Sequence, residues 1–132
     1  MNYWLIKSEP DTYAWSDLER DKKTTWDGVR NFLARNNLKA MKKGDMALFY
    51  HSMSDKAIVG VAKVVKEAYA DPKDNNWVAV DVAPVRKLKN AVTLAQIKAD
   101  KRFTHMVLVK SSRLSVQPVK AEEFDWIMAL GD

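Results

Sequence analysis

Short segments of alternating apolar and polar residues, separated by turn-forming residues, run through most of this chain and constrain its fold more than any other feature. Such alternation is typical of β-strands. The predicted strands comprise residues 3–7, 46–51, 57–68, 77–87, 106–109 and 113–119. Residues 53–56 suit a hairpin, residues 71–76 form a turn cluster, and Gly60 predicts a bulge or a close approach by another element. We therefore expect a mainly antiparallel sheet, which in a domain of this size can curl into a small barrel.

Helical signals interrupt and flank these strands. Serine or threonine followed three residues later by glutamate or glutamine, a capping box, opens predicted short helices at residues 16–19 and 93–96. Apolar residues recur at helical spacing in residues 31–41, and residues 121–130 predict a closing helix. Residues 24–28 are expected to form a loop. The predicted class is α+β, a curved, mainly antiparallel sheet or barrel of five or six strands flanked by short helices.

Composition limits the chemistry that this chain can perform. Its 132 residues have 47% hydrophobic and 30% charged side chains, with no repeat or linker, which predicts a single domain over residues 1–132. Cysteine is absent, which excludes disulfides, a catalytic thiol and cysteine-bound metals. Two histidines leave little for an imidazole metal site. We therefore expect no metal site and no cofactor.

Charge and aromatic content suggest the kind of partner. The first residues lead directly into a strand that carries Lys7 and Glu9, so we expect no signal peptide, no membrane segment and a cytoplasmic location, or a nuclear one in a eukaryote. A net charge of +5 permits a nucleic-acid partner without requiring one. Five tryptophans and four tyrosines serve either as core or as flat stacking surfaces.

Polar residues directly after the first predicted strand form the first candidate site. Lys7 can reach a phosphate, Ser8 can hydrogen-bond to a base edge, and Glu9 supplies a carboxylate. The alternative is a simple end to the strand, with Glu9 paired to a nearby arginine.

The second candidate surrounds a tryptophan in a predicted loop. Trp26 offers a stacking surface, Gly28 lets the backbone approach a ligand closely, and Arg30 suits phosphate binding or stacking. Asn31 can hydrogen-bond to a base, at a helix N-terminus whose N–H groups also attract anions. The alternative is that Trp26 packs in the core and Asn31 caps the helix.

A histidine near a predicted strand end forms the third candidate. Alternation places Phe49 and His51 on one face and Tyr50 on the other, so we expect only one of these faces to be core. His51 is a candidate acid or base, although a lone histidine is more often a hydrogen-bonding group. Ser8, Ser52 and Ser115 lack the sequence context of a catalytic nucleophile.

The fourth candidate lies on the last predicted strand. Alternation over residues 113–119 places Arg113, Ser115 and Gln117 together on one face. Such a row is suited to the polar wall of a pocket, or to a solvent-facing surface.

Taken together, these segments resemble the EVE domain, a family with the PUA-like fold. The matching runs follow the family's order over nearly the whole chain, and they are residues 3–10, 26–31, 34–38, 43–45, 49–52, 58–60, 77–82 and 113–119. One departure stands between Tyr69 and Trp77, where the family typically carries a longer insertion and this chain has only residues 70–76.

The resemblance implies kinship with YTH domains, which hold methylated adenine in an aromatic cage, and a role in reading modified bases in DNA or RNA. It implies that Trp26 is a cage wall and that Ser8, Asn31, Gly28 and Val29 contact the base edge. It also implies that further residues line or brace the pocket, namely Lys7, Glu9, His51, Ser52, Arg113, Ser115 and Gln117.

Three functions remain open from the sequence. The leading hypothesis is a non-enzymatic reader whose partner is DNA or RNA with a modified base, and we expect the modification to be a methyl group. The second is an enzyme acting on nucleic acids or nucleotides, with His51 and Glu9 as acid and base. The third is a module that binds a small ligand or a protein through the same pocket.

Overall fold

A computed structural model describes residues 1–53 and 55–132 of the chain. Its strands are β1 (Tyr3–Ser8), β2 (Thr24–Trp26), β3 (Met46–His51), β4 (Ala57–Asp71), β5 (Asp74–Thr93) and β6 (Val116–Val119). Its helices are α1 (Trp15–Asp21), α2 (Phe32–Ala40), α3 (Leu94–Ala99), the 3₁₀ turn η1 (Lys101–Phe103), α4 (Val107–Lys110) and α5 (Ala121–Gly131).

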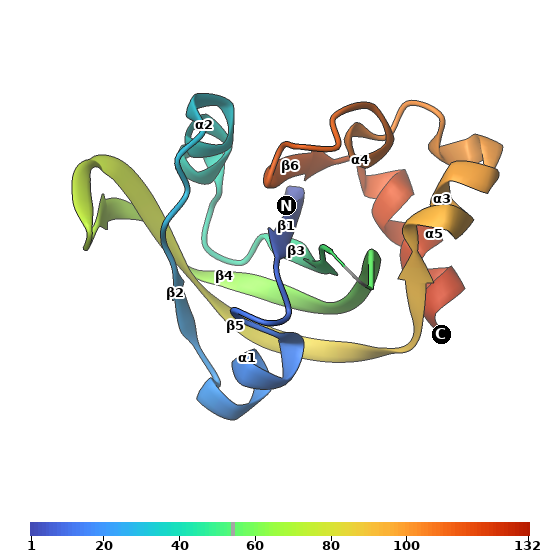
Figure 1. Cartoon of the computed structure of the whole chain (residues 1–132), viewed down its shortest axis with the longest axis horizontal. Coiled ribbons are helices and arrows are strands. Elements are labelled where there is room, and N and C mark those ends of the chain that lie inside the picture. Colours follow the sequence, from blue (N-terminus) through green and yellow to red (C-terminus); the bar gives the residue numbers. More distant parts are fainter. Residues whose placement is uncertain (54) are drawn as a thin grey trace.

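The strands form one mixed sheet in the order β2-β5-β4-β3-β1-β6 (Figure 1). The pairing of β1 with β3 is parallel, while the other neighbouring strands pair antiparallel. The parallel pair requires a long crossover, which here contains α1, β2 and α2. Because β2 and β6 are separate edges, the described part of the chain forms a curved open sheet and not the closed barrel that the sequence also allowed.

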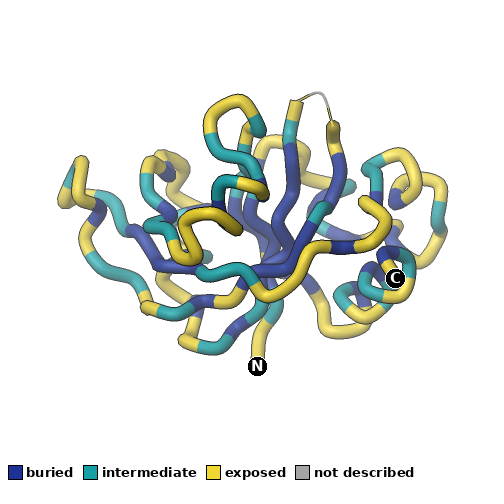
Figure 2. Tube along the Cα trace, turned by 90° about the horizontal axis from the view of Figure 1, so that it is seen from below, coloured by how far each residue is buried: buried dark blue, intermediate teal, exposed yellow. Residues whose placement is uncertain are grey.

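Helices cover both faces of this sheet. Trp4 and Ile6 of β1 pack in one apolar cluster with residues of α1 and α2, whereas Leu5 packs in a second cluster with residues of α3, η1 and α5. Figure 1 shows α3, α4 and α5 grouped away from α1 and α2. Figure 2 shows that buried residues concentrate in the middle of the strands and exposed ones along the turns.

Strand β3 lies inside the sheet and corrects one expectation. Phe49, Tyr50 and His51 are all buried, so both faces of this strand are core. These residues do alternate between the two faces of the strand, but alternation does not imply a solvent-exposed face when helices cover both sides of a sheet.

Four local predictions are wrong. Residues 24–26 form the edge strand β2 where we expected a loop. Residues 107–110, within the predicted strand 106–109, form the short helix α4. The predicted strand 113–119 begins only at Val116. Helix α1 begins after Ala14, whose backbone N–H donates to Asp17, so the predicted cap at Ser16 is not used.

Two other local predictions are confirmed. The Thr93 hydroxyl accepts from the backbone N–H of Gln96, and the Gln96 side chain accepts from the backbone N–H of Thr93. Gly60 lies at a shift in the β4–β5 register, and a methyl group there would lie 2.7 Å from the ring of Trp15. Of the helices that the structure describes, none has the length and apolar character needed to cross a membrane.

Candidate functional site

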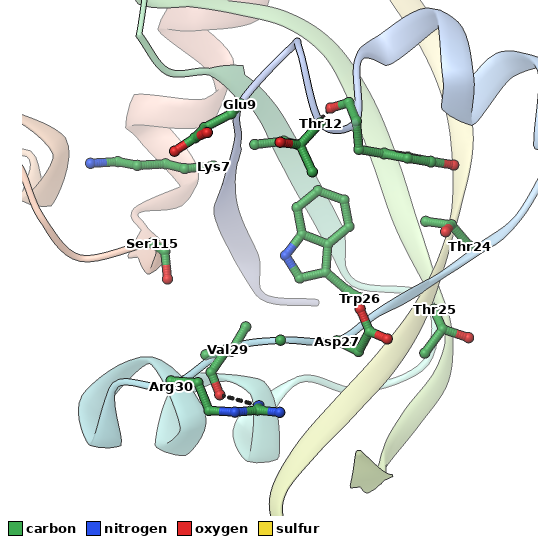
Figure 3. Close-up of a pocket in the computed structure, with 13 residues that line it drawn as sticks. Lys7, Glu9, Thr12, Thr24, Thr25, Trp26, Asp27, Val29, Arg30 and Ser115 are labelled. Atoms are coloured by element: carbon green, nitrogen blue, oxygen red, sulfur yellow. Dashed lines mark hydrogen bonds between the residues drawn. The ribbon is translucent and has the colours of Figure 1, made fainter. Parts of the chain in front are cut away.

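A cavity of about 560 Å³ opens where the end of β1 meets the segment from β2 to the start of α2. It is lined by residues 7–9, 12–13 and 24–30 together with Ser115 (Figure 3). These residues are far apart in sequence: β1 lies next to the edge strand β6, and β2 is the opposite edge strand, which leads into the loop before α2.

Trp26 forms an apolar wall of this cavity. Its side chain packs edge-on against Phe49, with ring centroids 5.5 Å apart, and against Tyr13, with centroids 6.4 Å apart. Only 9% of the residue is exposed, and it belongs to the core cluster beneath α1 and α2. Figure 3 shows the indole between the other lining side chains, with its nitrogen on the side of Lys7 and Ser115. Trp26 is therefore both a core residue and a rigid cavity wall.

The loop that follows Trp26 is held by a buried carboxylate. Gly28 has φ +77°, a conformation that suits glycine, and its backbone N–H donates to Asp71 at 2.9 Å. The Arg30 guanidinium donates to the same carboxylate oxygen at 3.0 Å and to the carbonyl of Val29. Asp71, the last residue of β4, is completely buried. The short β4–β5 hairpin therefore fixes one rim of the cavity.

The ionisation of Asp71 follows from these contacts. Burial by itself raises the pKa of a carboxyl group, because the charged form loses its hydration. Hydrogen bonds from Gly28, Lys73 and Arg30 outweigh this effect and hold the pKa of Asp71 below its usual range. The Asp71 carboxylate is therefore charged at neutral pH, and in this form it accepts the hydrogen bonds from Gly28 and Arg30 that hold the loop.

The opposite rim is the turn after β1. The Ser8 hydroxyl donates to the Tyr13 carbonyl at 2.5 Å, which closes the turn. Lys7 donates from Nζ to the Ser112 carbonyl at 2.6 Å, and burial lowers the pKa of its ammonium group. The backbone N–H of Lys7 also donates to Ser115, which ties this rim to the segment before β6.

Eight of the thirteen residues proposed from the sequence line the cavity. They are Lys7, Ser8, Glu9, Trp26, Gly28, Val29, Arg30 and Ser115. Sequence reasoning missed five others, which are Thr12, Tyr13, Thr24, Thr25 and Asp27. The only available signal for them was adjacency, since each lies within a few residues of a motif that was identified.

Asn31 and His51 do not line the cavity. The side chain of Asn31 accepts from the backbone N–H of Ala34 at 2.9 Å and caps α2, as the alternative interpretation held. His51 accepts from the backbone N–H of Trp15 at Nε2, and its Nδ1 lies 2.9 Å from the carboxylate of Asp55. Both ring nitrogens of His51 are thus engaged in contacts within the protein.

The remaining three residues also lie outside the lining. Ser52 donates its backbone N–H to the carbonyl of Ser8 at 2.9 Å, and so braces the rim. Arg113 is exposed before β6 begins, and Gln117 is buried, with its amide donating to the carbonyls of Ser111 and Leu114. The expected polar row does not form, because the chain is not extended at Arg113, and only Ser115 faces the cavity.

The open mixed sheet with helices on both faces is a PUA-like fold. The model of the EVE domain family matches residues 2–130. The chain therefore belongs to the EVE domain family.

Three similar proteins support this assignment. Thymocyte nuclear protein 1 of Homo sapiens is 38% identical, in an alignment that covers 98% of this chain and 73% of that protein. The NMR structure of Rpa0253 from Rhodopseudomonas palustris is 44% identical and superposes with a TM-score of 0.95, covering 99% of this chain and 93% of that one. The structure of the human THYN1 protein in complex with 5-methylcytosine-containing DNA is 36% identical, with a TM-score of 0.93, covering 100% and 98% of the two chains.

This chain is shorter than its human relative over the shared region. The alignment with human thymocyte nuclear protein 1 spans 165 positions, whereas this chain has 132 residues in all. In this chain Asp71 pairs with Asp74 across a turn formed by Pro72 and Lys73. The hairpin that we expected to be short therefore has a two-residue turn, and it contacts the cavity loop through Asp71.

Proposed function

We propose that this EVE domain is a non-enzymatic reader that encloses one methylated base of a nucleic acid in the cavity beside Trp26. The observation that carries the proposal is the rigid indole wall of a cavity whose other lining residues are mainly polar or charged (Figure 3). The human THYN1 protein forms a complex with DNA that contains 5-methylcytosine, which makes this base the first ligand to test.

The size and lining of the cavity suit a single base. Its volume of about 560 Å³ lies within the range of about 300–1,000 Å³ that is common for small-molecule sites. Stacking a base on an aromatic side chain contributes about 1–3 kcal/mol. Burying a methyl group adds about 0.8 kcal/mol. Flipping a base out of a duplex costs roughly a few kcal/mol, which these two contributions together offset.

Polar groups around the cavity can read the edge of a cytosine. Asp27 lines the cavity with its side chain 30% exposed, and a carboxylate is a suitable acceptor for the exocyclic amine of cytosine. The backbone of Gly28 and Val29 can approach a base closely because Gly28 has no side chain. Lys7 and Arg30 lie on opposite rims of the cavity and would meet the phosphates on either side of the base.

The enzymatic alternative has less support. His51 does not line the cavity, and Trp15 and Asp55 occupy its two ring nitrogens. Glu9 lines the cavity but is exposed, and it would act without the acid or base partner that the sequence suggested. The cytoplasmic location, with a nuclear one in a eukaryote, stays a prediction from the sequence.

The test is fluorescence anisotropy with labelled oligonucleotides, single- and double-stranded, that differ only in one 5-methylcytosine, one N6-methyladenine or no methylation. The methyl contribution of about 0.8 kcal/mol corresponds to a preference of about fourfold for the matching modified strand. Trp26→Phe reduces the stacking surface and should weaken binding and lower that preference. Thr12→Leu fills the mouth of the cavity from an exposed position that leaves the core intact, and it should have the same effect.

Controls separate the cavity from general binding. Trp126→Phe makes the same substitution on α5, where Trp126 packs against Phe103, and should leave affinity unchanged. Repeating the titrations at two salt concentrations isolates phosphate contacts, which weaken as salt rises. Equal affinity for modified and unmodified strands in the wild type, or a preference that survives both cavity variants, would refute the proposal. A salt-independent affinity for free nucleosides would favour the small-ligand alternative.

A further inference from the structure

A second aromatic surface lies outside the cavity. Phe32, the first residue of α2, is 67% exposed and stacks on Trp77 of β5, with ring centroids 5.2 Å apart and an angle of 27° between the rings. Phe32 belongs to neither apolar core cluster. A phenylalanine with so much exposed surface gains little from folding, which suggests a binding role.

Two arginines complete this surface. The Arg35 guanidinium carbon lies 5.0 Å from the ring centroid of Phe32 and 5.4 Å from that of Trp77. The Arg30 guanidinium carbon lies 5.6 Å from the Trp77 ring. Arg35 donates to the Asn76 carbonyl and forms no ion pair with any residue in the described ranges. We call these four residues, Phe32, Trp77, Arg30 and Arg35, the outer platform.

The outer platform is continuous with the cavity. Arg30 lines the cavity and also lies over Trp77, so one side chain belongs to both surfaces. Only Asn31 separates Arg30 from Phe32, and the Asn31 cap fixes the start of α2. A strand that placed one base beside Trp26 and left the cavity on the Arg30 side would therefore pass over the outer platform.

We propose that the outer platform stacks an unpaired base adjacent to the enclosed nucleotide on the same strand, while its arginines meet the neighbouring phosphates. This rests on the proposed function, since the enclosed base sets the register of the strand. Aromatic rings combined with cations are the pattern that binds single-stranded nucleic acid without sequence preference. Positive charge beside the rings favours a nucleic acid over an apolar partner. The platform would thus add affinity while the cavity supplies selectivity for methylation.

The experiment uses single-stranded oligonucleotides with one 5-methylcytosine and an abasic site placed in turn at each neighbouring position. Phe32→Ala removes the outer ring, and Leu33→Ala is its matched control, because Leu33 is the next residue and is 56% exposed. For the wild type we expect an abasic site on one side to weaken binding about fivefold or more, as stacking predicts. Phe32→Ala should weaken binding to the intact strand by a similar factor. In this variant the abasic site should not reduce the affinity further. Leu33→Ala should behave as the wild type.

Two further measurements separate this inference from the proposed function. Phe32→Ala should keep the full preference for the methylated strand, whereas Trp26→Phe should lower it. Arg35→Gln should reduce the slope of log affinity against log salt by about 0.7, the value for one phosphate contact on a single strand. If Phe32→Ala binds as tightly as Leu33→Ala, or if the abasic site weakens Phe32→Ala as much as the wild type, the stacking role is wrong. If the wild type binds methylated and unmethylated strands equally well, the cavity proposal is refuted, while the stacking role of Phe32 is still decided by the abasic-site comparison.

Discussion

Replacing Asp71 with asparagine tests how the cavity loop is held. One carboxylate oxygen, Oδ2, accepts from Gly28 at 2.9 Å and from Arg30 at 3.0 Å, and Oδ1 accepts from the backbone N–H of Lys73 at 2.7 Å. Asparagine has nearly the same shape but only one acceptor oxygen. Its NH₂ group must therefore face at least one of these donors inside the protein.

The expected cost follows from the burial of these groups. A hydrogen bond to a charged partner contributes about 1.5–3 kcal/mol, and an unsatisfied buried donor costs a similar amount. The ion pair with Arg30 adds little, because that side chain is 37% exposed and can turn to water. We expect Asp71→Asn to lower the free energy of unfolding by about 2–3 kcal/mol at neutral pH.

The effect should depend on pH in a defined direction. The pKa of Asp71 is held below its usual range, so the folded state binds a proton less readily than the unfolded chain. The carboxylate therefore stabilises the fold above the unfolded pKa of about 3.9, and this contribution is lost as the pH falls through the lower folded pKa. The difference between wild type and Asp71→Asn should shrink in the same range.

Urea denaturation followed by tryptophan fluorescence measures these differences. Asp125→Asn on α5 is the control, because Asp125 is exposed and the same charge is removed. A change of less than about 0.5 kcal/mol in Asp71→Asn at neutral pH, which is typical of exposed substitutions, would refute the role assigned to Asp71.

Three further predictions concern other parts of the structure. Gly60→Ala places a methyl group 2.7 Å from the Trp15 ring and should lower the free energy of unfolding by about 1–3 kcal/mol in the same assay; an unchanged urea midpoint would contradict the packing. Asn31→Ala removes the hydrogen bond to Ala34 and should cost about 1 kcal/mol of stability, whereas Asn31→Asp should preserve the cap; equal stability of all three proteins would be inconsistent with capping. Burial lowers the pKa of Lys7, so affinity for DNA should fall as the pH rises through that lowered value, and Lys7→Met should abolish this step in anisotropy titrations. A pH profile shared by the wild type and Lys7→Met would show that the Lys7 charge does not contribute.

Local sequence signals predicted most of the strands and helices but not their pairing. The capping box at Thr93 is a short-range hydrogen-bonding pattern, and it is present as predicted. Strand β2 was missed because three residues, Thr24–Trp26, are too few to show a period. Residues 107–110 are β-rich in composition, yet such a short apolar run is ambiguous, and here it forms a helix. The parallel pairing of β1 with β3 depends on tertiary packing, which no local pattern reports.

The candidate site shows the same division. Residues 7–9, Trp26 and residues 28–30 were found because chemically versatile residues follow one another in the sequence. Asp71 was treated as part of a turn, since nothing in the sequence links it to Gly28, 43 positions away. Arg113 and Gln117 were grouped with Ser115 by strand alternation, which fails because the strand starts only at Val116. Contacts between distant segments form only when the sheet is assembled. Local sequence patterns therefore do not predict them.

The most direct test of the central claim is the indole resonance of Trp26 in the ¹⁵N–¹H spectrum. The chain has five tryptophans, and the Trp26→Phe variant identifies the cross-peak by its absence. Titration with a 5-methylcytosine oligonucleotide should shift the Trp26 indole and Gly28 amide peaks strongly and leave the Trp4 indole peak, whose N–H donates to Asp45, in place. An unmethylated oligonucleotide should shift the Trp26 peak only at higher concentration. If binding shifts the amide peaks of residues next to surface lysines and arginines while the Trp26 indole peak does not move, the account is contradicted.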